Sequence, residues 1–264
     1  MKFLTRVALA ATMALGVAGV AKADLLADIK AKGEIAIAID LGAPPWGMTD
    51  ANLKPAGADV EVANKLAADL GVKMKLVEVT GPNRVPFLLT NKTDIVISSF
   101  AITPERAKVV DFVPYSVNRL IVFGPKGVEI KSLEDLSGKR VGVVRGNLQD
   151  TELTKKAPAD TKLVRFDDDA TTITALMSGQ VDAMCAPYGM YLTLAERYPA
   201  KELEPKADVV QQPLGIGLRQ NEPELKAWLQ DWVKKGAADG SLSTIFEKYM
   251  GAKLDLTPYL AEAK

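Results

Sequence analysis

Stretches with the periodicity of a β-strand alternate with stretches with the periodicity of an α-helix along almost all of this 264-residue chain. Residues 34–40 (EIAIAID) place isoleucine at every second position, as in a strand with one buried face. Residues 59–70 (DVEVANKLAADL) place three apolar side chains on one helix face and end before Gly71, a common helix terminator. This alternation predicts an α/β fold built mainly on parallel sheets.

Two segments of the chain repeat each other. Residues 88–99 (LLTNKTDIVISS) and 176–187 (LMSGQVDAMCAP) each run from a helix end through a polar turn into an apolar strand that begins at Asp. Chance is the alternative for a match this short. The repeat predicts two similar lobes, each with a strand that ends at a shared cleft, where ligands of open α/β sheets bind.

The first 23 residues have the features of a secretory signal peptide. Lys2 and Arg6 precede an apolar run at 7–20, and residues 21–23 (AKA) offer a small-residue cleavage site. The run is too short to span a membrane, although an N-terminal anchor is the alternative. We expect cleavage before Asp24 and a soluble protein in the periplasm.

Composition favours binding over catalysis. Lys plus Arg equals Asp plus Glu (33 each), which gives no support for a nucleic-acid or acidic-membrane partner. The single cysteine, Cys185, excludes an intrachain disulfide and is expected to be buried. The absence of histidine excludes Ser-His-Asp and Cys-His catalysis and removes the commonest zinc ligand. We expect neither a cofactor nor a metal.

Residues 97–106 (ISSFAITPER) join a buried strand to a helix start, with Thr103 as the predicted N-cap. Arg106 then falls in the first turn, where a cation is unfavourable by about 0.3–1 kcal/mol. A strand end, free N–H groups and a guanidinium together suit a small carboxylate ligand. A surface salt bridge from Arg106 to Glu105 or Asp111 is the alternative.

A second predicted anion site lies at residues 145–149 (RGNLQ), where Gly146 permits a tight turn from strand to helix. Arg145 either points into the cleft or lies on the surface. The residues expected to contact a ligand here are Arg145, Asn147, Leu148 and Gln149.

Several motifs follow one another in the order of a known family: the signal peptide, then residues 44–46 (PPW), 57–59 (GAD), 93–115, 132–150 and 213–225. Over essentially its whole mature length the chain resembles the bacterial extracellular solute-binding proteins of family 3, the periplasmic amino-acid-binding proteins of ABC importers. The resemblance implies a type II periplasmic-binding-protein fold, in which two α/β lobes joined by two hinge crossings close over a ligand.

The resemblance also implies limits for the two lobes. Residues 24–118 with 212–264 would form lobe 1, and residues 119–211 would form lobe 2. The two crossings are expected near 116–120 and 209–213.

The arginine that matches Arg106 holds the ligand α-carboxylate in this family, beside positions that match Ser99 and Ala101. The loop that matches Asn83 and Arg84 lines the lobe 1 side of the cleft. Asn83 is therefore expected to contact polar groups of the ligand, whereas Arg84 either adds positive charge there or is solvated.

Some positions depart from the family pattern. Pro187 stands where an aspartate usually receives the ligand ammonium, and Ala43 where an aromatic ring usually stacks on the ligand. Trp46 lies near the missing ring, and Asp40 and Tyr188 are candidates to replace the missing aspartate. A slip of one residue in the local match is the alternative. Ala101 and Leu148 likewise replace hydroxyl residues.

The sequence therefore predicts a monomeric binding protein that captures a small molecule with a carboxylate group and delivers it to an ABC permease. An amino acid is the favoured ligand. A non-amino-acid organic acid is the alternative. If Arg84, Arg106 and Arg145 all face the cleft, an anionic ligand such as an acidic amino acid or an organic acid is favoured. A cyclohexadienyl-dehydratase-like enzyme on this fold would need a general acid, for which Asp40 and Asp150 are candidates. A sensory protein that reports to a receptor is the remaining possibility.

Overall fold

The computed structural model describes residues 24–251, so the predicted signal peptide (1–23) lies outside the described residues. We keep the names lobe 1 and lobe 2 for the two halves of the chain as predicted above. Lobe 1 contains α1 (Leu25–Lys32), β1 (Glu34–Ile39), β2 (Met48–Thr49), β3 (Pro55–Ala56), α2 (Ala58–Leu70), β4 (Lys73–Glu78), η1 (Gly81–Asn83), α3 (Arg84–Leu89), β5 (Ile95–Val96), α4 (Pro104–Ala107), α8 (Pro223–Ala238) and α9 (Ser241–Met250). Lobe 2 contains η2 (Leu133–Leu136), β7 (Arg140–Val144), α5 (Leu148–Lys156), β8 (Lys162–Phe166), α6 (Asp169–Ser178), β9 (Ala183–Pro187), α7 (Tyr188–Arg197) and η3 (Pro199–Lys201).

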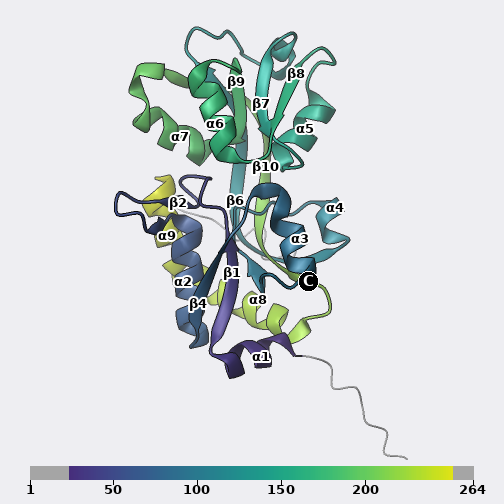
Figure 1. Cartoon of the computed structure of the whole chain (residues 1–264), viewed down its shortest axis with the longest axis vertical. Helices are drawn as coiled ribbons and strands as arrows, with labels where there is room; N and C mark the ends of the chain where they lie inside the picture. The colour runs from purple at the N-terminus through teal and green to yellow at the C-terminus, as the bar shows by residue number, and fades with distance from the viewer. Residues whose placement is uncertain (1–23, 252–264) are drawn as a thin grey trace, which may run out of the picture.

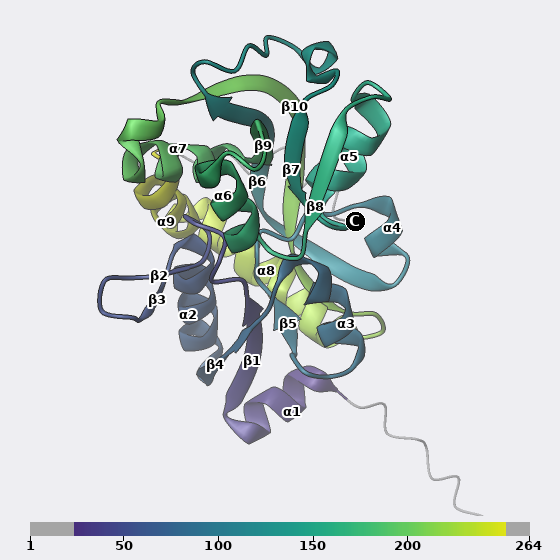
Figure 2. The same ribbon diagram turned by 45° about the horizontal axis from the view of Figure 1, so that its top comes forward.

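Two long strands, β6 (Val110–Pro125) and β10 (Leu203–Arg219), run through both lobes and pair antiparallel with each other (Figure 1). They lie at the centre of an eight-stranded sheet in the order β4-β1-β5-β10-β6-β9-β7-β8. In the view of Figure 2 the two groups of helices still lie at opposite ends of this strand pair. The predicted α/β fold with two lobes is confirmed, whereas the predicted residue limits of the lobes stay a prediction.

The outer strands of each lobe are parallel, as the alternation with helices predicted. β1 pairs in parallel with β4 and β5, and β7 pairs in parallel with β8 and β9. The two strands of the internal repeat take equivalent places, because β5 pairs with β10 and β9 pairs with β6, both antiparallel. The carboxyl ends of these parallel strands face the region between the lobes, where ligands of such sheets bind.

β1 shows how the pattern of apolar residues produces this layering. Its isoleucines belong to a core that α2 shares, while Ala38 on the other face belongs to a core with Leu88 of α3. Residues 35–39 are therefore buried on both faces of the strand, as in parallel sheets covered by helices on each side. α2 ends at Gly71, whose φ of 77° fits the left-handed conformation that glycine adopts without strain.

Candidate ligand-binding site

A cavity lies between the lobes, with walls formed by the ends of strands and the starts of helices from both. Its volume is about 40 Å³, enough for a few water molecules and well below the roughly 300–1,000 Å³ usual for small-molecule sites, so the lobes leave little free space between them. Aromatic side chains are absent from its described lining. The lining consists of Asp40, Ala43, Arg84, Ser98, Ser99, Ala101, Arg106, Asn118, Leu120, Asn147, Leu148, Gln149, Asp169, Pro187 and Met190.

Arg106 lies in the short helix α4, which begins after the N-cap Thr103 as the sequence predicted. Thr103 accepts a hydrogen bond from the Arg106 backbone N–H at 3.3 Å and caps the helix. The guanidinium donates to the carbonyl of Ala101 at 2.9 Å and, across the cleft, to the carbonyl of Gly146 at 3.4 Å. Burial, with a smaller contribution from Arg84, lowers the pKa of Arg106 to about 9.

Among the described residues, no carboxylate lies within 4 Å of the Arg106 guanidinium, so the predicted surface salt bridge to Glu105 or Asp111 is absent. Asp111 instead pairs with Lys226 at 3.1 Å. The Arg106 guanidinium also lies over the Phe100 ring, 5.0 Å from the ring centre. Arg106 is therefore a partly buried cation beside the cavity that has carbonyl and ring partners but no carboxylate, and it can accept an anion.

Arg84 is buried, with 5% of its surface exposed, and also lies at the cavity. Its guanidinium donates to the carbonyls of Gly81 (2.9 Å) and Ser98 (2.7 Å) and to the side-chain oxygen of Asn147 in lobe 2. Most of its donors are therefore occupied by the protein. Burial lowers the pKa of Arg84, whereas the carboxylates of Asp40 and Asp169 act in the opposite direction.

Ser99 has a positive φ of 44°, which costs free energy in a non-glycine residue and requires support. The buried carboxylate of Asp59 supplies it: one oxygen accepts the Ser99 N–H at 2.7 Å and the other accepts the Tyr115 hydroxyl at 2.6 Å. Burial, partly offset by these two bonds, raises the pKa of Asp59 to about 7. This support fixes the turn whose carbonyls receive Arg84.

The start of α5 brings lobe 2 to the same cavity. Asn147 occupies the N-cap position, but its side chain makes no capping bond and instead accepts from Arg84. The N–H groups in the first turn of α5 thus lack a side-chain cap, and Leu148 and Gln149 line the cavity. A helix start of this kind favours a bound anion.

Two carboxylates complete the charged lining. Asp40 follows β1 in lobe 1, and Asp169 is the first residue of α6 in lobe 2; 7% and 6% of their surfaces are exposed. Burial raises the pKa of both, to about 8 for Asp169, and the charge of Asp40 adds to the effect at Asp169. The cavity therefore has a cationic part at Arg106 and an anionic part at Asp40 and Asp169, whose carboxyl groups become fully ionised when a cation binds beside them, because a nearby positive charge lowers their pKa.

Eight of the twelve residues predicted for the site line the cavity: Asp40, Ser99, Ala101, Arg106, Asn147, Leu148, Gln149 and Pro187.

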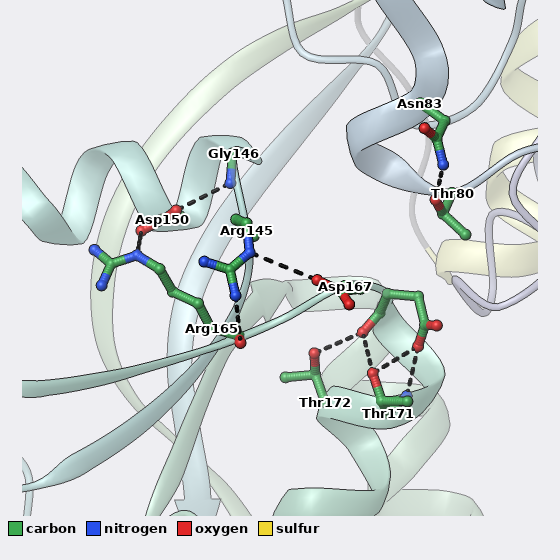
Figure 3. A network of polar contacts seen from close by, with 10 residues as sticks. Thr80, Asn83, Arg145, Gly146, Asp150, Arg165, Asp167, Thr171 and Thr172 are labelled. Carbon is green, nitrogen blue, oxygen red and sulfur yellow. Dashed lines mark hydrogen bonds and ion pairs between the residues drawn. The ribbon is translucent and has the colours of Figure 1, made fainter. Parts of the chain in front are cut away.

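The other four lie outside the lining. The Arg145 guanidinium is largely exposed and turns toward Asp167, 3.5 Å from its carboxylate (Figure 3). Asn83 donates to the Thr80 hydroxyl at 2.9 Å. Trp46 packs into lobe 1 with its ring centre 5.8 Å from that of Phe246, and the Arg119 guanidinium lies over the Tyr188 ring. The structure thus does not support the expectation that Arg145 and Trp46 face the ligand.

Asp169 is the most informative residue that the sequence interpretation missed. Its neighbour, the N-cap Asp168, accepts hydrogen bonds from Thr171 and Thr172 at the start of α6. The signal was the internal repeat: α3 and α6 both precede the strand next to the central pair. Arg84, the first residue of α3, lines the cavity, so the first residue of the equivalent helix α6, Asp169, could have been predicted to line it as well.

The lobes approach each other closely at three glycines. A Cβ atom at Gly42 would lie 3.8 Å from that of Ala170, and one at Gly189 would lie 2.7 Å from Sδ of Met250. A Cβ atom at Gly81 would overlap the side-chain amide of Asn147. Small residues therefore permit the close approach of the lobes around the cavity.

The fold and the cavity together define a two-lobed binding protein for a small charged solute. The sequence profile of the bacterial extracellular solute-binding proteins, family 3, matches residues 35–252. The chain belongs to this family. Within residues 24–251, every helix is too short or too polar to cross a membrane. No group of three or more His, Cys, Asp or Glu side chains in that range is arranged to hold a metal ion.

Named relatives agree with this assignment. The glutamine-binding protein of an ABC transporter from Bacillus subtilis is 29% identical over 236 residues, which cover 87% of this chain and 85% of the relative. The L-cystine-binding protein of Escherichia coli strain K12 is 28% identical, with 93% of each chain covered. A solved ancestral arginine-binding protein bound to arginine is 32% identical with a TM-score of 0.79, covering 83% of this chain and 99% of that one.

Proposed function

We propose that this protein captures a small amino acid between its lobes and delivers it to the permease of an ABC importer. The observation that carries the proposal is Arg106, a partly buried guanidinium at the cavity that pairs with no carboxylate in the described chain and donates to two carbonyls. A ligand carboxylate would form a charge-assisted bidentate pair with it. The uncapped first turn of α5 supplies further donors from lobe 2.

The charges around the cavity favour an amino acid over an acid with two anionic groups. Arg145 is turned toward Asp167, and Arg84 is engaged by carbonyls and Asn147, so neither supports a second anion. Asp40 and Asp169 would repel one. The relatives whose names give glutamine, cystine and arginine support the same class of ligand.

A thermal-shift screen of the mature protein tests the proposal. The screen contains the twenty common L-amino acids, L-cystine and a panel of simple mono- and dicarboxylic acids, and calorimetry follows each hit. We expect at least one amino acid to raise the unfolding temperature and to bind with 1:1 stoichiometry. Binding of dicarboxylates alone would exclude the amino acid, and binding of no carboxylate would exclude the function.

A cyclohexadienyl-dehydratase-like enzyme is the competing function. One structural neighbour, 31% identical with a TM-score of 0.79, is an ancestral amino-acid-binding protein described as a precursor of that enzyme. Asp169, whose pKa burial raises to about 8, meets the requirement for a proton donor at neutral pH. Asp150 lies outside the cavity lining, and its carboxylate accepts from Arg165 at 2.8 Å and from the Gly146 N–H at 2.9 Å.

We favour binding without catalysis, since the named relatives are binding proteins. Incubation with prephenate and with arogenate, followed by chromatography, separates the two functions. Formation of phenylpyruvate or phenylalanine would establish the enzyme.

The proposed location and partners follow from the family. We propose cleavage of residues 1–23, a periplasmic protein that acts as a monomer, and contact with a membrane permease. Size-exclusion chromatography with light scattering tests the monomer. A sensory role would require a receptor, and uptake assays in a strain that lacks the gene distinguish that role from transport.

A further inference from the structure

The anionic part of the cavity consists of one carboxylate from each lobe. Asp40 lies at the carboxyl end of β1, and Asp169 begins α6. One oxygen of Asp40 accepts the Gly42 N–H at 2.9 Å. The close approach of Gly42 to Ala170, the residue after Asp169, shows that the two loops face each other across the cleft.

Asp169 is buried and its charge has no direct partner. Within residues 24–251, no group donates a hydrogen bond to its carboxylate and no Lys or Arg nitrogen lies within 4 Å of it. A buried carboxylate without such partners carries a large desolvation cost. The second aspartate nearby adds like-charge repulsion, because each ionised carboxylate disfavours the other.

Arg84 does not neutralise this pair by contact. It acts on both carboxylates through space, but its donors are directed at the carbonyls of Gly81 and Ser98 and at Asn147. Both aspartates line the same cavity and are left without a cation in direct contact, so a cationic group of a ligand there would be stabilised by both carboxylates. Pro187, which also lines the cavity, carries neither charge nor a side-chain acceptor.

We propose that Asp169 and Asp40 together form the subsite for the ligand's ammonium group, with Asp169 supplying the charge that Pro187 cannot. This inference rests on the proposed capture of a carboxylate at Arg106. It makes the ligand a zwitterion and Asp169 a residue that determines specificity for it. Each end of the ligand then contacts both lobes: Arg106 and the start of α5 at the carboxylate, Asp40 and Asp169 at the ammonium.

The test compares amino acids with acids that lack only the amino group. L-glutamine, L-cystine, L-arginine and L-alanine are titrated by calorimetry into the wild-type protein, each beside the analogue in which hydrogen replaces every α-amino group. The same titrations use Asp169→Asn, which removes the charge with little change in shape. Asp168→Asn is the matched control, because it removes a neighbouring charge outside the cavity and asparagine still caps α6.

We expect the wild type to bind at least one amino acid about 30-fold to several thousand-fold more tightly than its analogue, the range for loss of a buried charge partner. Asp169→Asn should lower that ratio at least tenfold, while Asp168→Asn leaves it within about threefold.

Equal binding of amino acids and analogues by the wild type would overturn the ammonium subsite and leave carboxylate capture standing. An unchanged ratio in a folded Asp169→Asn protein would overturn the role of Asp169 alone. Binding of neither series would overturn the subsite together with the proposed function. If Asp169→Asn fails to fold, the wild-type comparison still decides whether the ammonium is recognised, and Asp169→Glu, which keeps the charge but moves it by one carbon, replaces it in the test of Asp169, with an unchanged ratio overturning that role.

Discussion

Replacing Arg106 by methionine removes the guanidinium while keeping a long unbranched side chain. The chain offers a matched control in Arg145→Met, since Arg145 also follows a strand near the cleft but pairs with the exposed Asp167. Both substitutions remove one positive charge. They differ in whether that charge borders the cavity.

The expected size of the effect follows from the contacts of Arg106. Loss of one partner from a buried charge pair costs about 2–5 kcal/mol. Because Arg106 keeps part of its surface in water, we expect the lower part of that range, about 2–3 kcal/mol, or about 30- to 150-fold in Kd. Arg145→Met should change Kd less than about threefold, since exposed ion pairs contribute little.

The ligand-free protein should respond differently. Burial and the neighbouring Arg84 lower the pKa of Arg106 to about 9, so its charge is unfavourable in the empty cavity. Removal of that charge should leave the unfolding temperature unchanged or slightly raised. The assay is calorimetry with the tightest amino acid of the screen, beside thermal unfolding without ligand.

Two results would refute this reasoning. A folded Arg106→Met protein that keeps its affinity within about threefold would show that the ligand carboxylate binds elsewhere. An equal loss in Arg145→Met would show that overall charge, and not contact with Arg106, governs affinity.

Two further substitutions test the closure of the lobes and the support of the site. Gly81→Ala should weaken ligand binding at least tenfold without lowering the ligand-free unfolding temperature, because the added carbon overlaps Asn147 only when the lobes meet. Gly127→Ala is the control, since Gly127 has open space around it. Equal affinities of the two variants would contradict the close approach of the lobes at Gly81. Asp59→Asn should lower the urea-unfolding free energy at pH 5 by about 1–3 kcal/mol, because asparagine cannot accept both the Ser99 N–H and a tyrosine hydroxyl. The folded wild type keeps a proton that the unfolded chain loses above its ordinary pKa of 3.8, because burial raises the pKa of Asp59 to about 7. The advantage of the wild type therefore declines between about pH 4 and pH 7 and levels off above pH 7. The difference between the proteins should be smaller at pH 8 than at pH 5, and a difference that grows would contradict the assignment.

Much of the fold was predictable because it depends on local periodicity. The alternation of isoleucines at 35, 37 and 39 predicted β1, and Thr103 with Pro104 predicted the start of α4. These signals depend on residues close in sequence, and the structure keeps them. Burial of Cys185, inferred from its chemistry, is also confirmed.

The orientation of single side chains was less predictable, since it depends on contacts between distant segments. Trp46 packs against Phe246 of the C-terminal α9, so it turns into lobe 1 and away from the cavity. Arg145 pairs with Asp167, which follows the neighbouring strand. Asp169 reaches the cavity only because the sheet order places α6 opposite the end of β1.

A crystal structure of the mature protein with its tightest amino acid tests the central claim most directly. We expect the amino acid between the lobes, with a carboxylate oxygen within about 3.2 Å of the Arg106 guanidinium and the ammonium within about 3.2 Å of Asp169. An amino acid bound outside this cavity would contradict the proposed binding site, and one bound with its ammonium away from both Asp40 and Asp169 would contradict the proposed ammonium subsite.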